Sequence, residues 1–136
     1  MAKRKILAID YGTKKIGLAV SDDARLLAFG RGIIDRTKGG IDKVAARLRE
    51  LCEKEHVTDF VFGLPLNHEN GEGDSAQRIR NFAKKLGLYF PDIAISFVDE
   101  SFSSFQAQNL QREAGRHGHD DEFAATIILQ RYLDSL

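Results

Sequence analysis

Short apolar runs separated by turn residues open the chain. Ile6–Ile9 and Ile16–Val20 are almost continuously apolar, and Leu26–Ile34 is a third run that two glycines interrupt. Runs of this length, bounded by turn residues, are typical of buried strands. Because the connections between them are short, we predict an antiparallel meander of three strands, with Gly12 and Gly17 as turn signals between the first two.

From Gly40 onward the apolar residues recur at spacings of three and four, which is the period of an amphipathic helix. Four segments have this helical character: residues 41–52, 76–86, 103–114 and a last one from about 122. Two apolar runs between them predict further strands: residues 60–62 and 93–98. Strands that are joined through helices pair in parallel by right-handed crossovers. We therefore expect an α/β fold with a mixed five-stranded sheet, three antiparallel strands followed by parallel crossovers, and helices on both faces.

Composition indicates one ordinary globular domain over residues 1–136. Of these residues, 43% are hydrophobic and 29% charged, and no repeat or linker interrupts the chain. The single cysteine, Cys52, excludes an internal disulfide and lies on the apolar stripe of the first helix, so we interpret it as a packing residue. No export signal or long apolar segment is visible, so we expect a cytoplasmic protein that has no membrane partner.

The net charge is zero, with 20 basic and 20 acidic residues, so a polyanionic partner would have to be met by a local patch. The first twenty residues contain five cations, among them Lys14 and Lys15, and one carboxylate, Asp10. Charge is therefore spread unevenly along the chain.

Three carboxylates occupy positions where the predicted topology brings them together. Asp10 ends the first strand, Glu100 ends the last strand, and Asp121 opens the final helix. Open sheets of this kind bind ligands at the carboxyl ends of their parallel strands. Convergent carboxylates repel one another unless they share a proton or bind a cation, and oxygen-only clusters favour Mg²⁺ or Mn²⁺. Two such ions can activate water and stabilise the leaving oxygen in phosphodiester cleavage.

Each carboxylate also has a structural interpretation. An aspartate in a turn accepts backbone hydrogen bonds, and acidic residues at a helix start complement the helix dipole. A register error of one residue would instead make Asp99, Asp120 or Glu122 the ligands. The convergence of all three predicted carboxylates favours a functional site.

Four segments, in this order, resemble the YqgF family: AIDYGTKKIGLAVSD, FGLPLNHENGEG, FVDESFSSFQA and DEFAATIILQRYL. This family of RuvX or RuvC-like proteins is described as pre-16S rRNA nucleases or Holliday junction resolvases. The most specific motifs are Asp10-x-Gly-x(4)-Gly-x-Ala, the triplet Gly63-Leu64-Pro65, and Asp121-x-x-Ala-Ala. The resemblance implies an RNase H-like fold and a catalytic, metal-binding triad of Asp10, Glu100 and Asp121.

One position departs from the family. Ser101 stands where the family usually has an arginine after the strand-ending Asp-Glu pair, which removes a bidentate phosphate donor. Where the family usually has two threonines, this chain has Ser103 and Ser104, which keep the hydroxyl groups. The chain therefore lacks a guanidinium that could hold a phosphate at position 101.

Nucleic-acid contacts are expected from five polar residues: Lys14, Lys15, Asn67, Ser103 and Arg116. Asn67 belongs to a turn-rich loop that could position a polynucleotide backbone or be an ordinary surface loop. Arg116 belongs to the segment RHGHDD, whose histidines could assist proton transfer or be solvated. Arg78, Arg80, Lys84 and Lys85 on the second helix are either phosphate ligands or a solvated face.

The function expected from the sequence is divalent-metal-dependent hydrolysis of phosphodiester bonds in precursor 16S rRNA, near the 5′ end. Two alternatives remain open at this point: a Holliday junction resolvase acting on branched DNA, and a ribosome-assembly or nucleic-acid-binding factor without turnover. Resolution by paired cuts requires a two-fold dimer, and the sequence leaves monomer and homodimer open. A sugar-kinase-like phosphotransferase would need a second domain that 136 residues do not supply.

Overall fold

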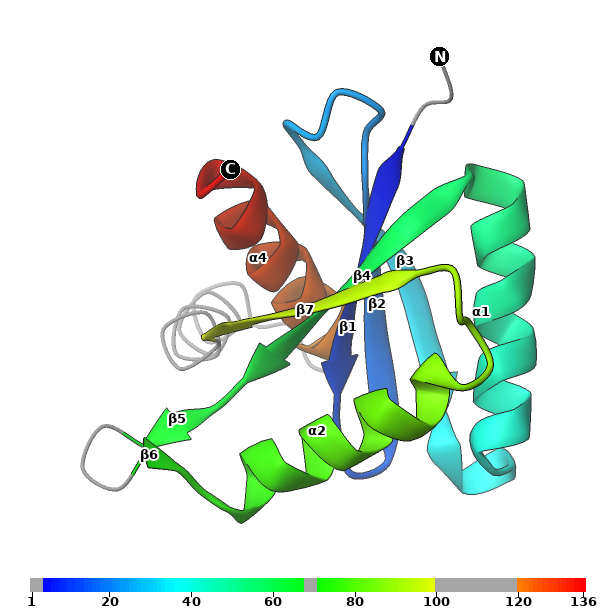
Figure 1. The fold of residues 1–136 in the computed structure, drawn as a ribbon, viewed down its shortest axis with the longest axis vertical. Coiled ribbons are helices and arrows are strands. Elements are labelled where there is room, and N and C mark those ends of the chain that lie inside the picture. The colour runs from blue at the N-terminus through cyan, green and yellow to red at the C-terminus, as the bar shows by residue number, and fades with distance from the viewer. Residues whose placement is uncertain (1–3, 68–70, 100–119) are drawn as a thin grey trace.

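The computed structural model describes residues 4–67, 71–99 and 120–136 (Figure 1). Its main sheet contains five strands: β1 (Lys5–Tyr11), β2 (Lys15–Ser21), β3 (Ala28–Asp35), β4 (Val57–Leu64) and β7 (Ala94–Asp99). A separate two-stranded ribbon is formed by β5 (Leu66–Asn67) and β6 (Gly71–Glu72). The helices are α1 (Ile41–Glu55), α2 (Asp74–Gly87) and α4 (Asp120–Asp134), with a short 3₁₀ turn at Arg36–Lys38.

The strand order is β3-β2-β1-β4-β7, which confirms the predicted mixed sheet. Strand β2 pairs antiparallel with both β1 and β3, whereas β4 pairs in parallel with β1 and β7. The central position of β1 follows from this order, because the meander extends from one of its edges and the crossovers from the other. Its carboxyl end is therefore flanked by strands on both sides.

Helices cover both faces of the sheet, as expected. Helices α1 and α2 pack on one face, where they bury Leu7 and Ile9 of β1. Helix α4 packs on the other face against Ile6 and Ala8. The fully buried run of β1 is thus explained by a strand with a helix layer on each side (Figure 1).

Small residues let α4 approach the sheet closely. Ala8 of β1 pairs with Ala19 of β2, and both are fully buried beneath Ala125 of α4. A larger side chain at any of these positions would overpack the layer. This packing gives a structural reason for the alanines of the motifs around Asp10 and Asp121.

Some sequence-based assignments were wrong. Leu26 and Leu27 precede β3 because their N–H groups donate to the Asp22 carboxylate, at 2.7 and 3.0 Å, and form a turn. The hydrogen bonds from the N–H groups of Leu27 and Leu26 also lower the pKa of the Asp22 carboxyl group. Gly17 lies inside β2 and is not a turn residue, and β4 continues through Gly63, beyond the end predicted at residue 62. The helix predicted at residues 103–114 lies outside the described residues.

Cys52 packs against the core beneath α1, which confirms its interpretation as a packing residue. Burial raises the pKa of its thiol to about 11. A thiol with that pKa is almost entirely protonated at neutral pH, so it is a poor nucleophile.

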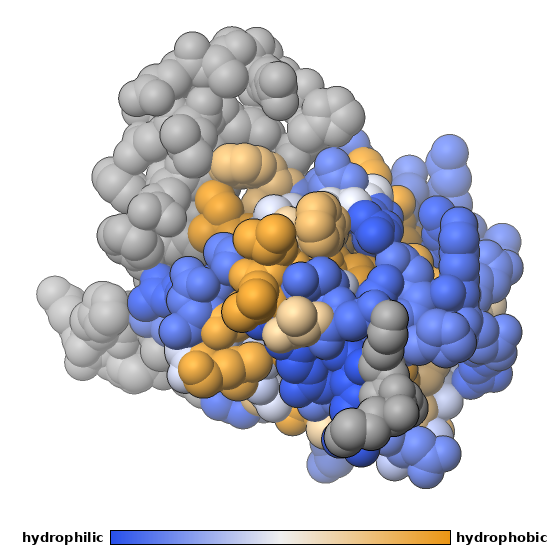
Figure 2. Space-filling model, turned by 90° about the horizontal axis from the view of Figure 1, so that it is seen from above, coloured by the Kyte–Doolittle hydropathy of each residue, from blue (hydrophilic) through white to orange (hydrophobic). Residues whose placement is uncertain are grey.

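Exposed apolar residues gather at the end of the sheet that carries the β2–β3 connection, and Figure 2 shows a hydrophobic band on that face. Leu26 is 66% exposed and Leu27 56%, and the C-terminal Leu136 is 67% exposed. This end is opposite to the carboxyl end of β1. The band is therefore separate from the site described below.

Candidate active site at the carboxyl edge of the sheet

Asp10 is the penultimate residue of β1, the central strand. The four residues before it are buried, whereas Asp10 itself is partly exposed. Ile6 and Ala8 face α4, and strand alternation therefore turns Asp10 toward the same face. A carboxylate thus emerges at the carboxyl end of the central strand, where sheets of this type bind ligands.

Glycines flank Asp10 on both neighbouring strands. Asp10 pairs directly with Gly17 of β2. On the other side Ile9 pairs with Phe62, which brings Gly63 of β4 alongside Asp10. Paired residues of adjacent strands project to the same face, so the lack of a side chain at both glycines leaves no strand side chain directly beside the carboxylate. The motif glycines thus keep both positions beside Asp10 free of strand side chains, which the assignment of Gly17 to a turn missed.

Strand β7 distinguishes two of the candidate ligands. Ile95 and Phe97 pack in the layer beneath α1 and α2, whereas Val98 packs with α4. Alternation places Asp99 on the same face as Ile95 and Phe97, away from the Asp10 carboxylate. The described geometry therefore disfavours Asp99 as a ligand beside Asp10. Glu100 lies outside the described residues.

Helix α4 runs antiparallel to β1, so it begins at the edge where β1 ends. Near its start the Glu122 carboxylate accepts a hydrogen bond from Gly32 N–H of β3, at 2.5 Å. Near its end Gln130 accepts from Ala28 N–H at 3.1 Å and donates to the Leu26 carbonyl at 2.9 Å. These two anchors fix the direction of the helix. The backbone of Asp121 therefore lies at the same edge of the sheet as Asp10.

Glu122 anchors α4 to the edge strand, which argues against its alternative assignment as a metal ligand. Gly32 adopts φ +85°, a left-handed conformation that favours glycine, and presents its N–H to the carboxylate. A Cβ atom built on Gly30 would come within 2.8 Å of Glu122 Cδ. Gly30 therefore leaves space for the Glu122 side chain, and Gly32 donates a hydrogen bond to it. In the sequence alone, these glycines only interrupt the third apolar run.

We expect Glu122→Ala to lower the free energy of unfolding by about 1 to 2 kcal/mol, because it leaves the Gly32 N–H without its carboxylate acceptor. The same change should slow cleavage by releasing the first turn of α4. Glu122→Gln keeps an acceptor oxygen and should restore most of both properties. Chemical denaturation and single-turnover cleavage measure the two effects. A Glu122→Gln protein that is stable but inactive would instead identify the carboxylate as a ligand.

Lys14 and Lys15 are exposed in and after the β1–β2 connection, close in sequence to Asp10. Arg36 holds this connection: its N–H donates to the Lys14 carbonyl at 2.8 Å, and its Nη1 donates to the carbonyls of Gly12 and Thr13 at 2.6 and 2.9 Å. The two lysines therefore project from an ordered turn at the site. By contrast, Lys5 lies at the other end of β1 and pairs with Glu55 at 3.8 Å.

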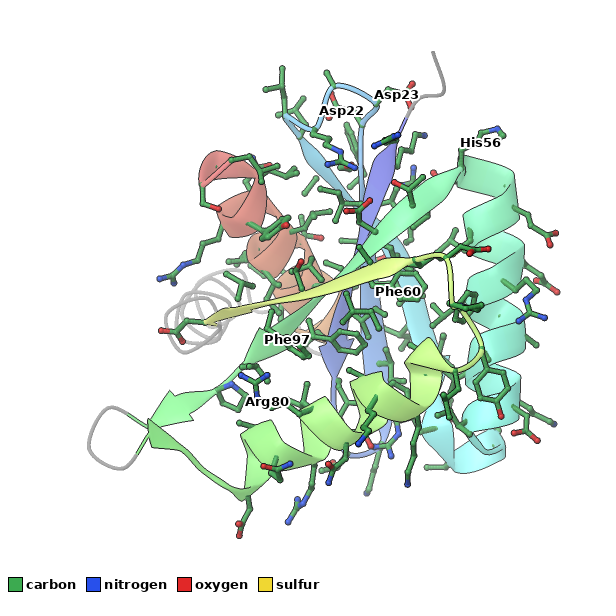
Figure 3. All side chains as sticks on the ribbon, in the orientation of Figure 1. Asp22, Asp23, His56, Phe60, Arg80 and Phe97 are labelled. Atoms are coloured by element: carbon green, nitrogen blue, oxygen red, sulfur yellow. The ribbon has the colours of Figure 1, made fainter. Side chains whose placement is uncertain are left out.

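Of the other predicted nucleic-acid contacts, only Asn67 lies in the described part of the chain. Asn67 belongs to β5, just beyond the carboxyl end of β4. Ser103, Arg116 and the histidines near it lie outside the described part of the chain. Of the helix α2 cations, Arg80 points to β7 and stacks on Phe97, with its guanidinium carbon 4.7 Å from the ring centroid (Figure 3).

Within residues 4–67, 71–99 and 120–136, the structure contains no group of three metal-ligating side chains. Two members of the predicted triad have no described side chain, since Glu100 lies outside these ranges and Asp121 is described by its backbone alone. Asp22 and Asp23 lie together at the opposite end of the sheet from Asp10 (Figure 3). They are therefore not part of this site.

Comparison with known proteins identifies the family. A family model described as "RuvX: Holliday junction resolvase" matches residues 4–135. The chain belongs to the RuvX family. It is 39% identical to a protein of Maridesulfovibrio salexigens, covering 95% of this chain and 97% of that protein, and 41% identical to one of Porphyromonas gingivalis, covering 96% of each. Both relatives carry the name "Putative pre-16S rRNA nuclease".

Solved structures confirm the RNase H-like fold of this RuvX-family chain. RuvC of T. thermophilus, in complex with a Holliday junction substrate, superimposes with a TM-score of 0.58 at 14% identity, covering 97% of this chain and 94% of that one. The fowlpox virus Holliday junction resolvase gives a TM-score of 0.55 at 16% identity, covering 97% and 99%. At these identities the likeness concerns the fold alone. None of the described helices combines the length and apolar character needed to cross a membrane.

Proposed function

We propose that this RuvX-family nuclease hydrolyses phosphodiester bonds of precursor 16S rRNA, near the 5′ end, with Mg²⁺ or Mn²⁺ as cofactor. The observation that carries the proposal is the position of Asp10. Its carboxylate stands at the carboxyl end of the central strand between two glycines, on the face where α4 begins. At the two paired positions of the neighbouring strands, no side chain stands beside the carboxylate.

Asp10, Glu100 and Asp121 are the proposed metal ligands. Carboxylate oxygens are the donors that Mg²⁺ and Mn²⁺ prefer, so the chemistry of the donor set fits these ions. Glu100 is favoured over Asp99 because alternation turns Asp99 to the other face of the sheet. When bound, such cations supply an activated water and stabilise the charge on the leaving oxygen. The chain itself orients these carboxylates, and Glu122 positions the helix that carries Asp121.

Substrate binding is assigned to cations and polar groups around this edge. Lys14 and Lys15 are exposed beside Asp10 and are proposed to neutralise phosphates of the polynucleotide. Asn67, Ser103 and Arg116 are proposed as further contacts. One domain over residues 1–136 would then contain the whole site.

As the substrate we propose precursor rRNA and not a four-way DNA junction. The name of the M. salexigens and P. gingivalis relatives supports RNA, whereas the description of the family model supports junctions. A resolvase makes paired cuts and requires a two-fold dimer. An rRNA-processing role needs no such dimer and places the protein in the cytoplasm.

Cleavage of two end-labelled substrates tests this proposal: an RNA that spans the 5′ leader of precursor 16S rRNA, and a four-way DNA junction. We expect Mg²⁺-dependent cleavage of the RNA at defined positions, and no cleavage in EDTA. Symmetric paired nicks in the junction, made by a dimer, would instead establish a resolvase. Tight binding of the RNA without cleavage under any metal condition would establish a factor without turnover.

A further inference from the structure

A cavity of about 390 Å³ lies between the start of α1 and one face of α2. Tyr11, the residue after Asp10, forms part of its wall. From α2 come Arg78, Asn81, Phe82 and Lys85, which lie at i, i+3, i+4 and i+7 and thus share one side of the helix. The cavity adjoins the carboxyl end of β1 but opens on the sheet face opposite to the Asp10 carboxylate.

Positive charge dominates the cavity. Three cations line it, Arg36, Arg78 and Lys85, and no acidic residue does. None of the three forms an ion pair with a carboxylate in the described part of the chain. The Arg36 guanidinium donates to the carbonyl oxygens of Gly12 and Thr13, which carry no formal charge. A concave surface lined by three cations and no carboxylate attracts a polyanion.

The wall of the cavity is ordered by aromatic packing. The Tyr11 ring lies 4.4 Å from that of Phe82, centroid to centroid, and the Arg36 guanidinium carbon lies 4.2 Å from the Tyr11 centroid. Phe82 is itself buried in the core. The Arg36 cation is therefore held in place by its stacking and by two carbonyls, in contrast to a freely solvated surface side chain.

The start of α1 adds hydrogen-bond donors. Helix α1 begins after Gly40, which offers no side-chain acceptor to the first N–H groups of the helix. A Cβ atom at Gly40 would meet nothing within 4 Å, so the approach to these groups is open. The one carboxylate of the first turn, Asp42, accepts a hydrogen bond from the Tyr89 hydroxyl at 2.8 Å and does not line the cavity.

We propose that this cavity binds backbone phosphates of the polynucleotide substrate on one side of the scissile bond. The inference rests on the proposed nuclease function. Asp10 and Tyr11 are adjacent in β1 and project to opposite faces, so a strand that crosses this edge of the sheet can reach the carboxylate and the cavity together. The cavity would then hold the strand in register while the carboxylate face cleaves it.

The test compares two double variants that lose the same charge. Arg78→Gln with Lys85→Gln removes two cavity cations, and both side chains are exposed, so the core is untouched. Arg47→Gln with Lys54→Gln removes two exposed cations of α1 that lie away from the cavity. The probe is a fluorescein-labelled 20-nucleotide RNA, titrated in EDTA so that no cleavage occurs, with fluorescence anisotropy as the readout at several salt concentrations.

For the cavity variant we expect affinity to fall about tenfold at 100 mM salt, and the log–log salt slope to decrease by about 1.4, or 0.7 for each lost single-strand phosphate contact. The α1 variant should keep the wild-type slope. In Mg²⁺ the cavity variant should raise KM, whereas Asp10→Asn should lose kcat and keep its affinity in EDTA. Asn81→Glu, which adds a negative charge to the cavity, should also weaken binding.

Equal affinities and slopes in the two double variants would overturn the inference. If the wild type still cleaves RNA in that case, the proposed function stands and only the cavity assignment fails. If the wild type neither binds nor cleaves any polynucleotide, the proposed function fails and the cavity assignment fails with it.

Discussion

Asp10→Asn should abolish metal-dependent cleavage while the protein remains folded. The amide keeps the shape of the carboxylate but loses the charge that holds the cation. Loss of several kcal/mol of metal-derived stabilisation of the transition state corresponds to about 10³-fold or more in rate. Single-turnover cleavage of the precursor RNA, with circular dichroism to verify the fold, measures this effect.

Asp92→Asn is the matched control, because Asp92 is exposed in the connection before β7, at the opposite end of that strand from the site. It makes the same change of charge and should retain wild-type activity. Full activity in a folded Asp10→Asn protein would show that Asp10 has no part in the mechanism. Family membership would then be the remaining support for the nuclease function.

Metal should stabilise the wild-type protein. The three proposed ligands should repel one another without a cation, and Mg²⁺ or Mn²⁺ should bind their native arrangement in preference to the unfolded chain. At a hundredfold excess over its dissociation constant, the cation should add about 2.7 kcal/mol to the free energy of unfolding. Thermal melts with metal and with chelator measure this gain.

The same repulsion predicts how Glu100→Gln and Asp121→Asn change the free energy of unfolding, and the change depends on whether metal is present. Each variant should be more stable than the wild type in chelator, because one repelling charge is gone, and should lose the metal-induced gain. A carboxylate that only caps a helix would show neither effect. Equal metal responses in the wild type and both variants would mean that Glu100 and Asp121 are structural residues.

The sheet could be predicted from local pattern because its strands differ in periodicity from its helices. Continuous apolar runs such as Ile6–Ile9 require a helix layer on each face, and α1, α2 and α4 supply those layers. The start of β3 could not be predicted in this way. Leu26 and Leu27 continue the apolar run, but the Asp22 carboxylate captures their N–H groups and keeps them in a turn.

The role of the motif glycines depends on strand register, which the sequence does not display. Gly17 has the appearance of a turn residue beside Gly12, yet its partner across the sheet is Asp10. Only pairing between residues that are distant in sequence shows that it keeps space beside the carboxylate. The argument against Asp99, the register alternative to Glu100, likewise needed the alternation of β7 relative to its two helix layers.

Long-range polar contacts were also beyond sequence analysis. The Glu122 carboxylate and the Gly32 N–H are 90 residues apart, and no local pattern connects them. The cavity next to Tyr11 combines side chains from β1, the 3₁₀ turn, α1 and α2. From sequence alone, Arg78 and Lys85 could not be distinguished from Arg80, which instead stacks on Phe97.

The position of the bound metal tests the central claim most directly. Crystals soaked in Mn²⁺, at a concentration that supports full cleavage, should give an anomalous scattering peak within coordination distance of the Asp10 carboxylate, on the sheet face that α4 covers. The same soak of Asp10→Asn crystals should show no peak at that position. A wild-type crystal that is active in Mn²⁺ but has no peak at Asp10, or a peak only at Asp22 and Asp23, would contradict the account.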